Sequence, residues 1–437
     1  MKKYVLFLFV LVMTALLCMS FAYADVVLPD KVNVGIKYGS SAVAKAELSA
    51  SGMQITDVYG APLYDGSHLS SVTVEYSDGV IKLTSNGAVV FSYGGDIMVT
   101  PNSGLIKLDG KSYRGSFKFV IKNSALMVIN YVGLEDYICG VVPQEIGGSS
   151  PAESLKAQAV CSRSYTARFI GRHSSDGFDI CSGTHCHVYG GTSRETEASN
   201  KAVYDTAGVI AMYGDKIAEL YYFASDGGAT EDVKNVWGST VHPYLAAVDD
   251  PYETDEASYH KWSVTFTPDD LKTIFAPYNL GDITDISVIE TTEKGAVLKL
   301  QVTGTNGSRV FEKEKSRTVF GGKIYSQAYS ITKNYEGGGT SPSASGASQT
   351  VTLPSIVYVM GKDGVVEKRV EEITVMSSTG TSRLQTGGKV VSYTLNGRGW
   401  GHLIGMSQWG AIAMGKQGFT YEQILNYYYQ GITLVQK

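Results

Sequence analysis

Five side chains that bear sulfur or imidazole lie within 15 residues of one another, from His173 to His187. Thiolate sulfur and imidazole nitrogen are the donors that tetrahedral zinc prefers. The spacing predicts a zinc site with the ligands His173, Cys181, His185 and Cys186, and with His187 as a substitute for His173. Four protein ligands close such a site, so the zinc would be structural. A Cys181–Cys186 disulfide, or a polar loop without metal, is the alternative.

Glu145 is a candidate proton donor that stands between a predicted β segment and a predicted capped helix. Its neighbours Val142, Pro143 and Ile146 are apolar, and no other acidic residue stands in the same run. Apolar surroundings favour a protonated carboxyl group, which can then donate a proton at neutral pH. Taken alone, however, a glutamate in this setting is more often a surface or capping residue.

Lys156 and Arg163 are the cationic side chains nearest to this acid in a predicted helix. They lie close to two turns apart and therefore on one side of that helix. They could hold an anionic group of a substrate, or they could form a solvated basic edge.

Local sequence signals predict the elements that must position these groups. Between residues 32 and 99, short apolar stretches alternate with Gly, Asn, Asp and Ser turns, which favours β-hairpins. A second hairpin is predicted over 117–129, with its turn at Asn123-Ser124. Ser150, Pro151 and Glu153 predict an N-cap, a first-turn proline and a capping glutamate for a helix that begins there. Further helices are predicted over 193–206 and after Thr420.

Composition excludes several classes of protein. With 37 Lys+Arg against 42 Asp+Glu and no blocks of one sign, an electrostatic nucleic-acid binder is not expected. A hydrophobic content of 43% excludes disorder for most of the chain. Tyrosine, with 29 copies, dominates the aromatic residues. A tyrosine-rich surface of low charge is a weak indication of binding to neutral polymers such as sugars.

The beginning of the chain predicts export. Lys2 and Lys3 precede an apolar run, and Ala22-Tyr23-Ala24 offers small residues at the positions that an export peptidase reads. We expect residues 1–24 to be a signal peptide cleaved after Ala24, and an uncleaved anchor is the alternative. The membrane is then involved only through this export signal.

Several ordered blocks across residues 110–434 resemble the stage II sporulation protein D family. These blocks are Leu134-Glu135-Asp136-Tyr137, Gly140 to Glu145, Leu155 to Tyr165, Ser225-Asp226-Gly227-Gly228 with Trp237, Ser316-Arg317-Thr318, Gly399 to Ala411, and Leu425 to Tyr429. The match does not extend in the same detail to residues 25–100.

The resemblance implies a lytic transglycosylase that cleaves MurNAc–GlcNAc bonds of peptidoglycan, especially in strands already stripped of peptides. The family's catalytic acid maps onto Glu145, and Lys156 and Arg163 fall beside it. His402 and Gln408 are candidates for glycan contact, with hydrogen bonding inside a Gly-rich turn as the alternative. The family also implies a wall amidase as partner and a role in wall remodelling or spore engulfment. Some members carry zinc in the Cys/His region. The export signal predicts a location outside the cell or in its wall.

We therefore expect an α+β fold, mainly antiparallel β-hairpins with a few short helices around the catalytic region. The predicted division is a signal peptide (1–24), a β-rich domain (25–105), a catalytic region (106–334), a Gly/Ser-rich linker with a β insertion (335–390), and the C-terminal part of the catalytic region (391–437). Leu403-Ile404 stand where many relatives have Gly-Val, so the loop near His402 departs from the pattern.

Two other functions compete with the glycan-cleaving enzyme. Relatives include amidase enhancers, so a non-catalytic wall-binding enhancer of an N-acetylmuramoyl-L-alanine amidase is the alternative. A zinc hydrolase would need an open metal position and a general base.

Overall fold

A computed structural model of the chain describes residues 26–239, 242–335, 356–361, 364–369, 372–377, 380–385 and 390–437. The predicted signal peptide therefore lies outside the described residues. The predicted Gly/Ser-rich linker lies outside them too, except for its first residue, Tyr335. The chain divides into two compact units, Met1–Tyr221 with Met414–Lys437, and Tyr222–Ala413. We describe each by itself.

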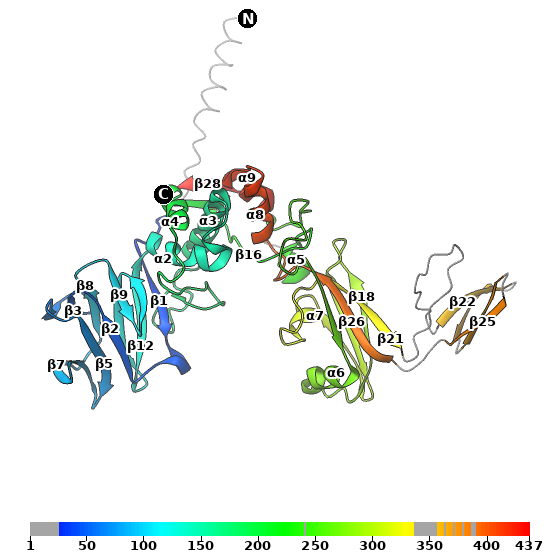
Figure 1. Cartoon of the computed structure of the whole chain (residues 1–437), viewed down its shortest axis with the longest axis horizontal. Helices are drawn as coiled ribbons and strands as arrows, with labels where there is room; N and C mark the ends of the chain where they lie inside the picture. The colour runs from blue at the N-terminus through cyan, green and yellow to red at the C-terminus, as the bar shows by residue number, and fades with distance from the viewer. Residues whose placement is uncertain are drawn as a thin grey trace, which may run out of the picture. The chain divides into compact units, whose positions relative to one another are not determined.

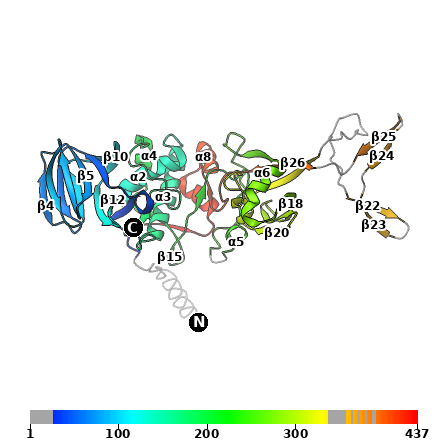
Figure 2. The same cartoon turned by 90° about the horizontal axis from the view of Figure 1, so that it is seen from below.

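Two sheets stacked face to face form the N-terminal part of the first unit (Figures 1 and 2). One sheet has the strand order β13-β1-β12-β11-β8-β3-β4: β1 (Lys31–Lys37), β3 (Met53–Asp57), β4 (Pro62–Gly66), β8 (Ile97–Pro101), β11 (Ser116–Lys122), β12 (Ala125–Gly133) and β13 (Ile180–Cys181). The other has the order β10-β9-β2-β5-β6-β7: β2 (Lys45–Ser49), β5 (Ser71–Ser77), β6 (Val80–Ser85), β7 (Ala88–Tyr93), β9 (Leu105–Leu108) and β10 (Lys111–Arg114). These two sheets are antiparallel apart from the parallel pair of β1 and β13. A three-stranded sheet contains β14 (Val209–Tyr213), β15 (Lys216–Ile217) and β28 (Thr433–Gln436).

The predicted hairpins are confirmed, and turn chemistry explains them. Strands β5 and β6 are joined through Asp78 and Gly79, whose φ angles are +54° and +83°. Strands β11 and β12 are joined through Asn123 and Ser124, at +52° and +59°. Two consecutive positive φ values define the turn whose twist matches that of the flanking strands, and Asp, Asn and Gly tolerate it best.

The helices of the first unit gather around the long helix Ala152–Phe169 (Figure 1). They are α2 (Leu134–Val142), the π-helical turn η2 (Pro143–Gly147), α3 (Ala152–Phe169), α4 (Glu197–Asp205) and α9 (Tyr421–Tyr428), and a 3-10 turn η1 (Gly39–Ser41) follows β1. The predicted helices at 193–206 and after Thr420 are confirmed; Thr420 caps α9 through its side chain.

Two local predictions near Glu145 are wrong. The segment before it is the helix α2 rather than a β segment. Leu134, Tyr137, Ile138 and Val141 recur at helical spacing, and residues 137–142 are all buried. Pro151, with ψ of 143°, is the N-cap of α3 instead of its first helical residue, and the Ser150 hydroxyl donates to the Ile146 carbonyl instead of capping.

The second unit is built on two three-stranded antiparallel sheets and short helices. The strands are β17 (Lys261–Phe266), β26 (Val390–Arg398) and β21 (Tyr329–Tyr335) in one sheet, and β18 (Ile283–Thr291), β19 (Val297–Gly304) and β20 (Gly307–Glu312) in the other. The short strands β16 (Tyr222–Phe223) and β27 (Met406–Ser407) pair in parallel. Two antiparallel pairs follow in the chain: β22 (Ile356–Gly361) with β23 (Gly364–Arg369), and β24 (Glu372–Ser377) with β25 (Gly380–Gln385). The helices are α5 (Val233–Val236), α6 (Pro268–Phe275), η3 (Ala276–Tyr278), α7 (Lys315–Thr318) and α8 (Gln408–Lys416), whose last turn belongs to the first unit.

Mostly antiparallel sheets with a few helices make this an α+β protein, as the sequence predicts. The core of the second unit lies around Phe275, Leu300, Phe320 and Leu395, all at most 1% exposed. Among the described residues, no helix combines the length and the apolar character needed to cross a bilayer.

Three acidic side chains are buried together in the second unit. The carboxylate of Glu253 accepts hydrogen bonds from two backbone amides and two hydroxyl groups and lies 3.1 Å from His260 Nδ1. Asp226 is fully buried, and burial together with the charges of Asp250 and Glu253 raises the pKa of its carboxyl well above the usual range. The Arg398 guanidinium nearby donates to backbone carbonyls, including that of Asp226.

Replacing Asp226 by Asn should therefore stabilise the protein more at high pH than at low pH. The raised pKa favours a proton on folded Asp226 that the unfolded chain releases near pH 4. The contribution of Asp226 to the free energy of unfolding therefore falls as pH rises above that value, by at most about 1.4 kcal/mol per pH unit. Urea unfolding between pH 4 and 8 measures this. A difference between Asp226→Asn and wild type that does not grow with pH contradicts the argument.

Candidate functional site

Glu145 lies in the π-helical turn η2, directly after helix α2. Single π-helical turns at the end of a helix are frequent at functional sites. The side chain is half-buried, and its Oε1 accepts a hydrogen bond of 3.1 Å from the backbone amide of Val188. Glu145 is therefore held on one side while part of the side chain reaches solvent.

The amide that holds Glu145 belongs to the end of the Cys/His loop. Val188 follows His185, Cys186 and His187 directly in the chain. The geometry of this loop thus sets the position of the donor that orients Glu145. The sequence shows both features, but it does not show that one hydrogen bond joins them.

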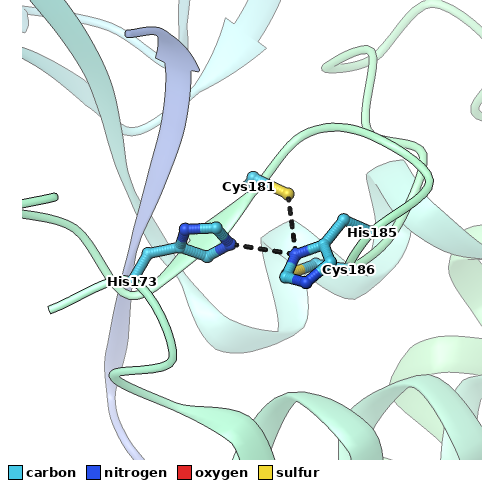
Figure 3. Close-up of side chains that lie close together, drawn as sticks. All are labelled: His173, Cys181, His185 and Cys186. Carbon is cyan, nitrogen blue, oxygen red and sulfur yellow. Dashed lines mark hydrogen bonds between the residues drawn. The ribbon is translucent and has the colours of Figure 1, made fainter. Parts of the chain in front are cut away.

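The four predicted metal ligands come together, as Figure 3 shows. Their donor atoms all lie within 4.8 Å of one another. His185 Nδ1 lies 3.2 Å from His173 Nε2, 3.9 Å from Cys181 Sγ and 3.7 Å from Cys186 Sγ. Ligands at the usual zinc distances in a tetrahedral arrangement are about 3.4 Å apart for two nitrogens and about 3.6 Å apart for nitrogen and sulfur. The four residues fit a zinc ion.

Two further observations agree with a metal site. His173 Nδ1 lies 3.0 Å from Asp176 Oδ2, the carboxylate contact that commonly orients a ligating imidazole. The described cysteines all have free thiols, so the Cys181–Cys186 disulfide is not formed in this structure. Burial raises the pKa of the Cys186 thiol to about 11, an effect that a bound cation opposes.

His187 lies outside this group of four and faces Tyr137. Its Nδ1 is 3.1 Å from the Tyr137 hydroxyl, and burial lowers the pKa of its imidazole to about 3. Burial raises the pKa of the fully buried Tyr137 hydroxyl well above its usual range. Sequence analysis does not single out Tyr137, although it stands in the motif quoted above, because a buried tyrosine has no sequence signal of its own.

Lys156 forms ion pairs with two acidic side chains, Glu153 and Asp205. Its Nζ lies 2.8 Å from Glu153 and 3.8 Å from Asp205, and the Glu153 contact raises the pKa of the ammonium group. Glu153 also accepts a hydrogen bond from the Tyr421 amide and so links α3 to α9.

Arg163 is fully buried in helix α3. Its guanidinium binds both carboxylate oxygens of Glu135, at 2.8 and 2.6 Å, and the carbonyls of Val203 and Val209. This arrangement joins α3 to α2, α4 and β14, and it gives no support to substrate contact by Arg163.

His402 and Gln408 belong to the second unit, whereas Glu145, Lys156 and Arg163 belong to the first. The half-buried His402 ring lies between Phe223 and Trp237, with ring centroids 5.3 and 5.0 Å away. Burial, and secondarily Arg317, lowers its pKa to about 3, so the neutral imidazole accepts a hydrogen bond from the Ile404 amide. Gln408 is 8% exposed at the start of α8.

In this fold, one glutamate lies beside a segment whose two histidines and two cysteines fit a zinc ion. A family model described as Stage II sporulation protein matches residues 122–213, which include Glu145 and the whole Cys/His loop. A second model, Domain of unknown function (DUF8618), matches residues 249–351.

Relatives extend the similarity over most of the chain. An uncharacterized protein of Brachyspira hyodysenteriae is 27% identical over 372 residues, 84% of each chain. The amidase enhancer of Bacillus subtilis is 29% identical over 358 residues, which cover 78% of this chain and 47% of that protein. Stage II sporulation protein D of Bacillus subtilis is 27% identical over 327 residues, 71% of this chain and 77% of that protein. The chain thus spans about half the length of the amidase enhancer, and its residues 122–213 are similar to the stage II sporulation protein family.

Proposed function

We propose that the protein is an exported peptidoglycan lytic transglycosylase in which Glu145 is the acid and base. The observation that carries the proposal is the placement of this carboxyl group: half-buried, oriented by the Val188 amide, and inside the matched family segment. The substrate class follows from the family resemblance, and peptide-free glycan strands are the expected substrate.

One carboxyl group is sufficient for the reaction. Glu145 donates its proton to the glycosidic oxygen as the bond from that oxygen to C1 of MurNAc breaks. The resulting carboxylate then accepts the proton of the C6 hydroxyl while O6 bonds to C1, which closes a 1,6-anhydro ring and restores the acid. Water is not consumed, so no second carboxylate is required, in contrast to hydrolytic glycosidases. Product masses from wild type and Glu145→Gln test this assignment.

Zinc bound by His173, Cys181, His185 and Cys186 would act as a structural clamp in this enzyme. A site with four protein ligands has no open position for substrate or water, so the metal supplies structural rigidity. The clamp fixes the loop that ends at Val188 and thereby the hydrogen bond to Glu145.

Removal of one zinc ligand should lower both the zinc content of the protein and its free energy of unfolding. We expect wild type to copurify with a stoichiometric amount of zinc, and Cys181→Ser to lose it. At a free zinc concentration a thousandfold above Kd, the lost stabilisation is about 4 kcal/mol. Elemental analysis and urea unfolding measure the two effects, with His68→Ala, an exposed histidine elsewhere in the unit, as the control. Equal zinc content in wild type and Cys181→Ser contradicts the site.

A non-catalytic enhancer of a wall amidase is the second candidate, because a relative bears the name amidase enhancer. An enhancer would increase the products of an added amidase and release no anhydro sugars by itself. The assay for Glu145 therefore separates the two functions when it is run with and without amidase.

A further inference from the structure

Three aromatic rings form a partly exposed cluster in the second unit. Trp400 is 45% exposed and Tyr259 is 38% exposed, although both are large and apolar. The ring centroids of Tyr259 and Tyr325 are 4.1 Å apart, and Trp400 lies 4.8 Å from Tyr259 and 6.2 Å from Tyr325. We call these three residues the aromatic platform.

The backbone holds Trp400 firmly although its ring is exposed. Its amide donates to the Ser225 carbonyl at 2.6 Å, and the Ser225 amide donates back at 3.2 Å. The flanking residues Gly399 and Gly401 have φ angles of +75° and +126°. A Cβ at either position would lie 2.6 Å from a neighbouring atom, the Ser225 carbonyl oxygen or Phe223 Cβ. The loop backbone at Trp400 therefore has little conformational freedom.

Tyr259 adopts a backbone conformation that tyrosine rarely takes. Its φ is +63°, in the left-handed region where a bulky side chain is strained. The adjacent His260 carbonyl accepts a hydrogen bond from the Gly399 amide, which ties this strained position to the Trp400 loop. Strain of this kind persists where the surroundings enforce it, and it is concentrated at ligand sites.

Two pairs of titratable groups on the same loop lie within ion-pair distance. Asp255 lies 2.9 Å from Lys261 Nζ, and His260 Nδ1 lies 3.1 Å from Glu253. These four groups are engaged with one another, so the platform offers chiefly aromatic faces, which favours an uncharged ligand.

We propose that the aromatic platform binds the C–H face of an uncharged N-acetylhexosamine ring in a glycan strand. Aromatic side chains have an apolar face and, in Tyr and Trp, a polar group at the edge, so they can stack on a sugar ring and hydrogen-bond its hydroxyl groups. Rings already held in place lose little conformational entropy when the ligand binds. The choice of ligand rests on the proposed function, and the proposal adds a subsite for the neutral sugar.

Calorimetric titration of the full chain with chitohexaose, an uncharged N-acetylglucosamine oligomer, tests the platform. The titration uses the Glu145→Gln variant, so that binding is measured without turnover. We expect Trp400→Ala and Tyr259→Gly each to weaken binding at least about tenfold. Tyr259→Gly removes the ring and also relieves the positive φ, so its melting temperature should equal or exceed that of the parent. Tyr59→Ala, which removes a ring that is 93% exposed in the first unit, is the matched control and should bind normally.

The outcomes separate this proposal from the proposed function. No binding of chitohexaose by the parent, or unchanged binding by folded Tyr259→Gly, overturns the platform. If wild type releases no anhydro sugars while the platform variants still lose binding, the transglycosylase assignment fails and the platform stands. If anhydro sugars form but all variants bind alike, the platform fails and the enzyme assignment stands.

Discussion

Glu145→Gln should reduce the release of 1,6-anhydro products from peptide-free glycan strands by about 10²- to 10⁴-fold, the usual contribution of a general acid or base. The amide replaces the carboxyl at nearly the same size and can still accept the hydrogen bond from the Val188 amide. It cannot donate a proton to the glycosidic oxygen or accept one from the C6 hydroxyl. Mass spectrometry distinguishes the anhydro products, because each is lighter by one water than the hydrolytic product.

Glu197→Gln is the matched control for this experiment. Glu197 is exposed in the first turn of α4, in the same unit as Glu145, and the same chemical change there should leave product release unchanged. If Glu145→Gln and wild type release equal amounts of anhydro sugar, Glu145 is not the acid. If neither releases any but both stimulate an added amidase, the enhancer is the better assignment.

Arg163→Met should lower the free energy of unfolding by about 3–5 kcal/mol, the cost of removing one partner of a buried ion pair. The substitution leaves the Glu135 carboxylate without the guanidinium that binds both of its oxygens. It also removes the donors to the Val203 and Val209 carbonyls, which join α3 to α4 and β14. Urea unfolding measures this loss.

Arg168→Met provides the control on the same helix. Arg168 is 44% exposed and pairs with Glu219 at 2.9 Å, so its loss should cost at most about 1 kcal/mol. The comparison also tests substrate binding by Arg163. An Arg163→Met protein with wild-type stability and weakened glycan binding would show that Arg163 contacts substrate instead of holding the fold.

Local sequence signals determined much of the secondary structure. Consecutive turn residues such as Asn123-Ser124 determine a hairpin, because their backbone conformation depends on the residues themselves. The capping box at Thr420 determines the start of α9 in the same way. The prediction failed at 134–142, where apolar residues are compatible with a strand or a helix and packing decides between them.

The sequence also determined which groups could form the site, because residue type and close spacing are visible in it. Cys181, His185 and Cys186 lie on one short loop, so their proximity hardly depends on the rest of the fold. Only the tertiary structure decided that the Val188 amide at the end of this loop orients Glu145, which lies 43 positions away in the chain. It also decided that Arg163 is buried against Glu135, since a helical arginine looks the same in sequence whether it faces solvent or a buried carboxylate. Contacts between distant segments depend on how the elements pack, and local sequence patterns carry little information about that packing.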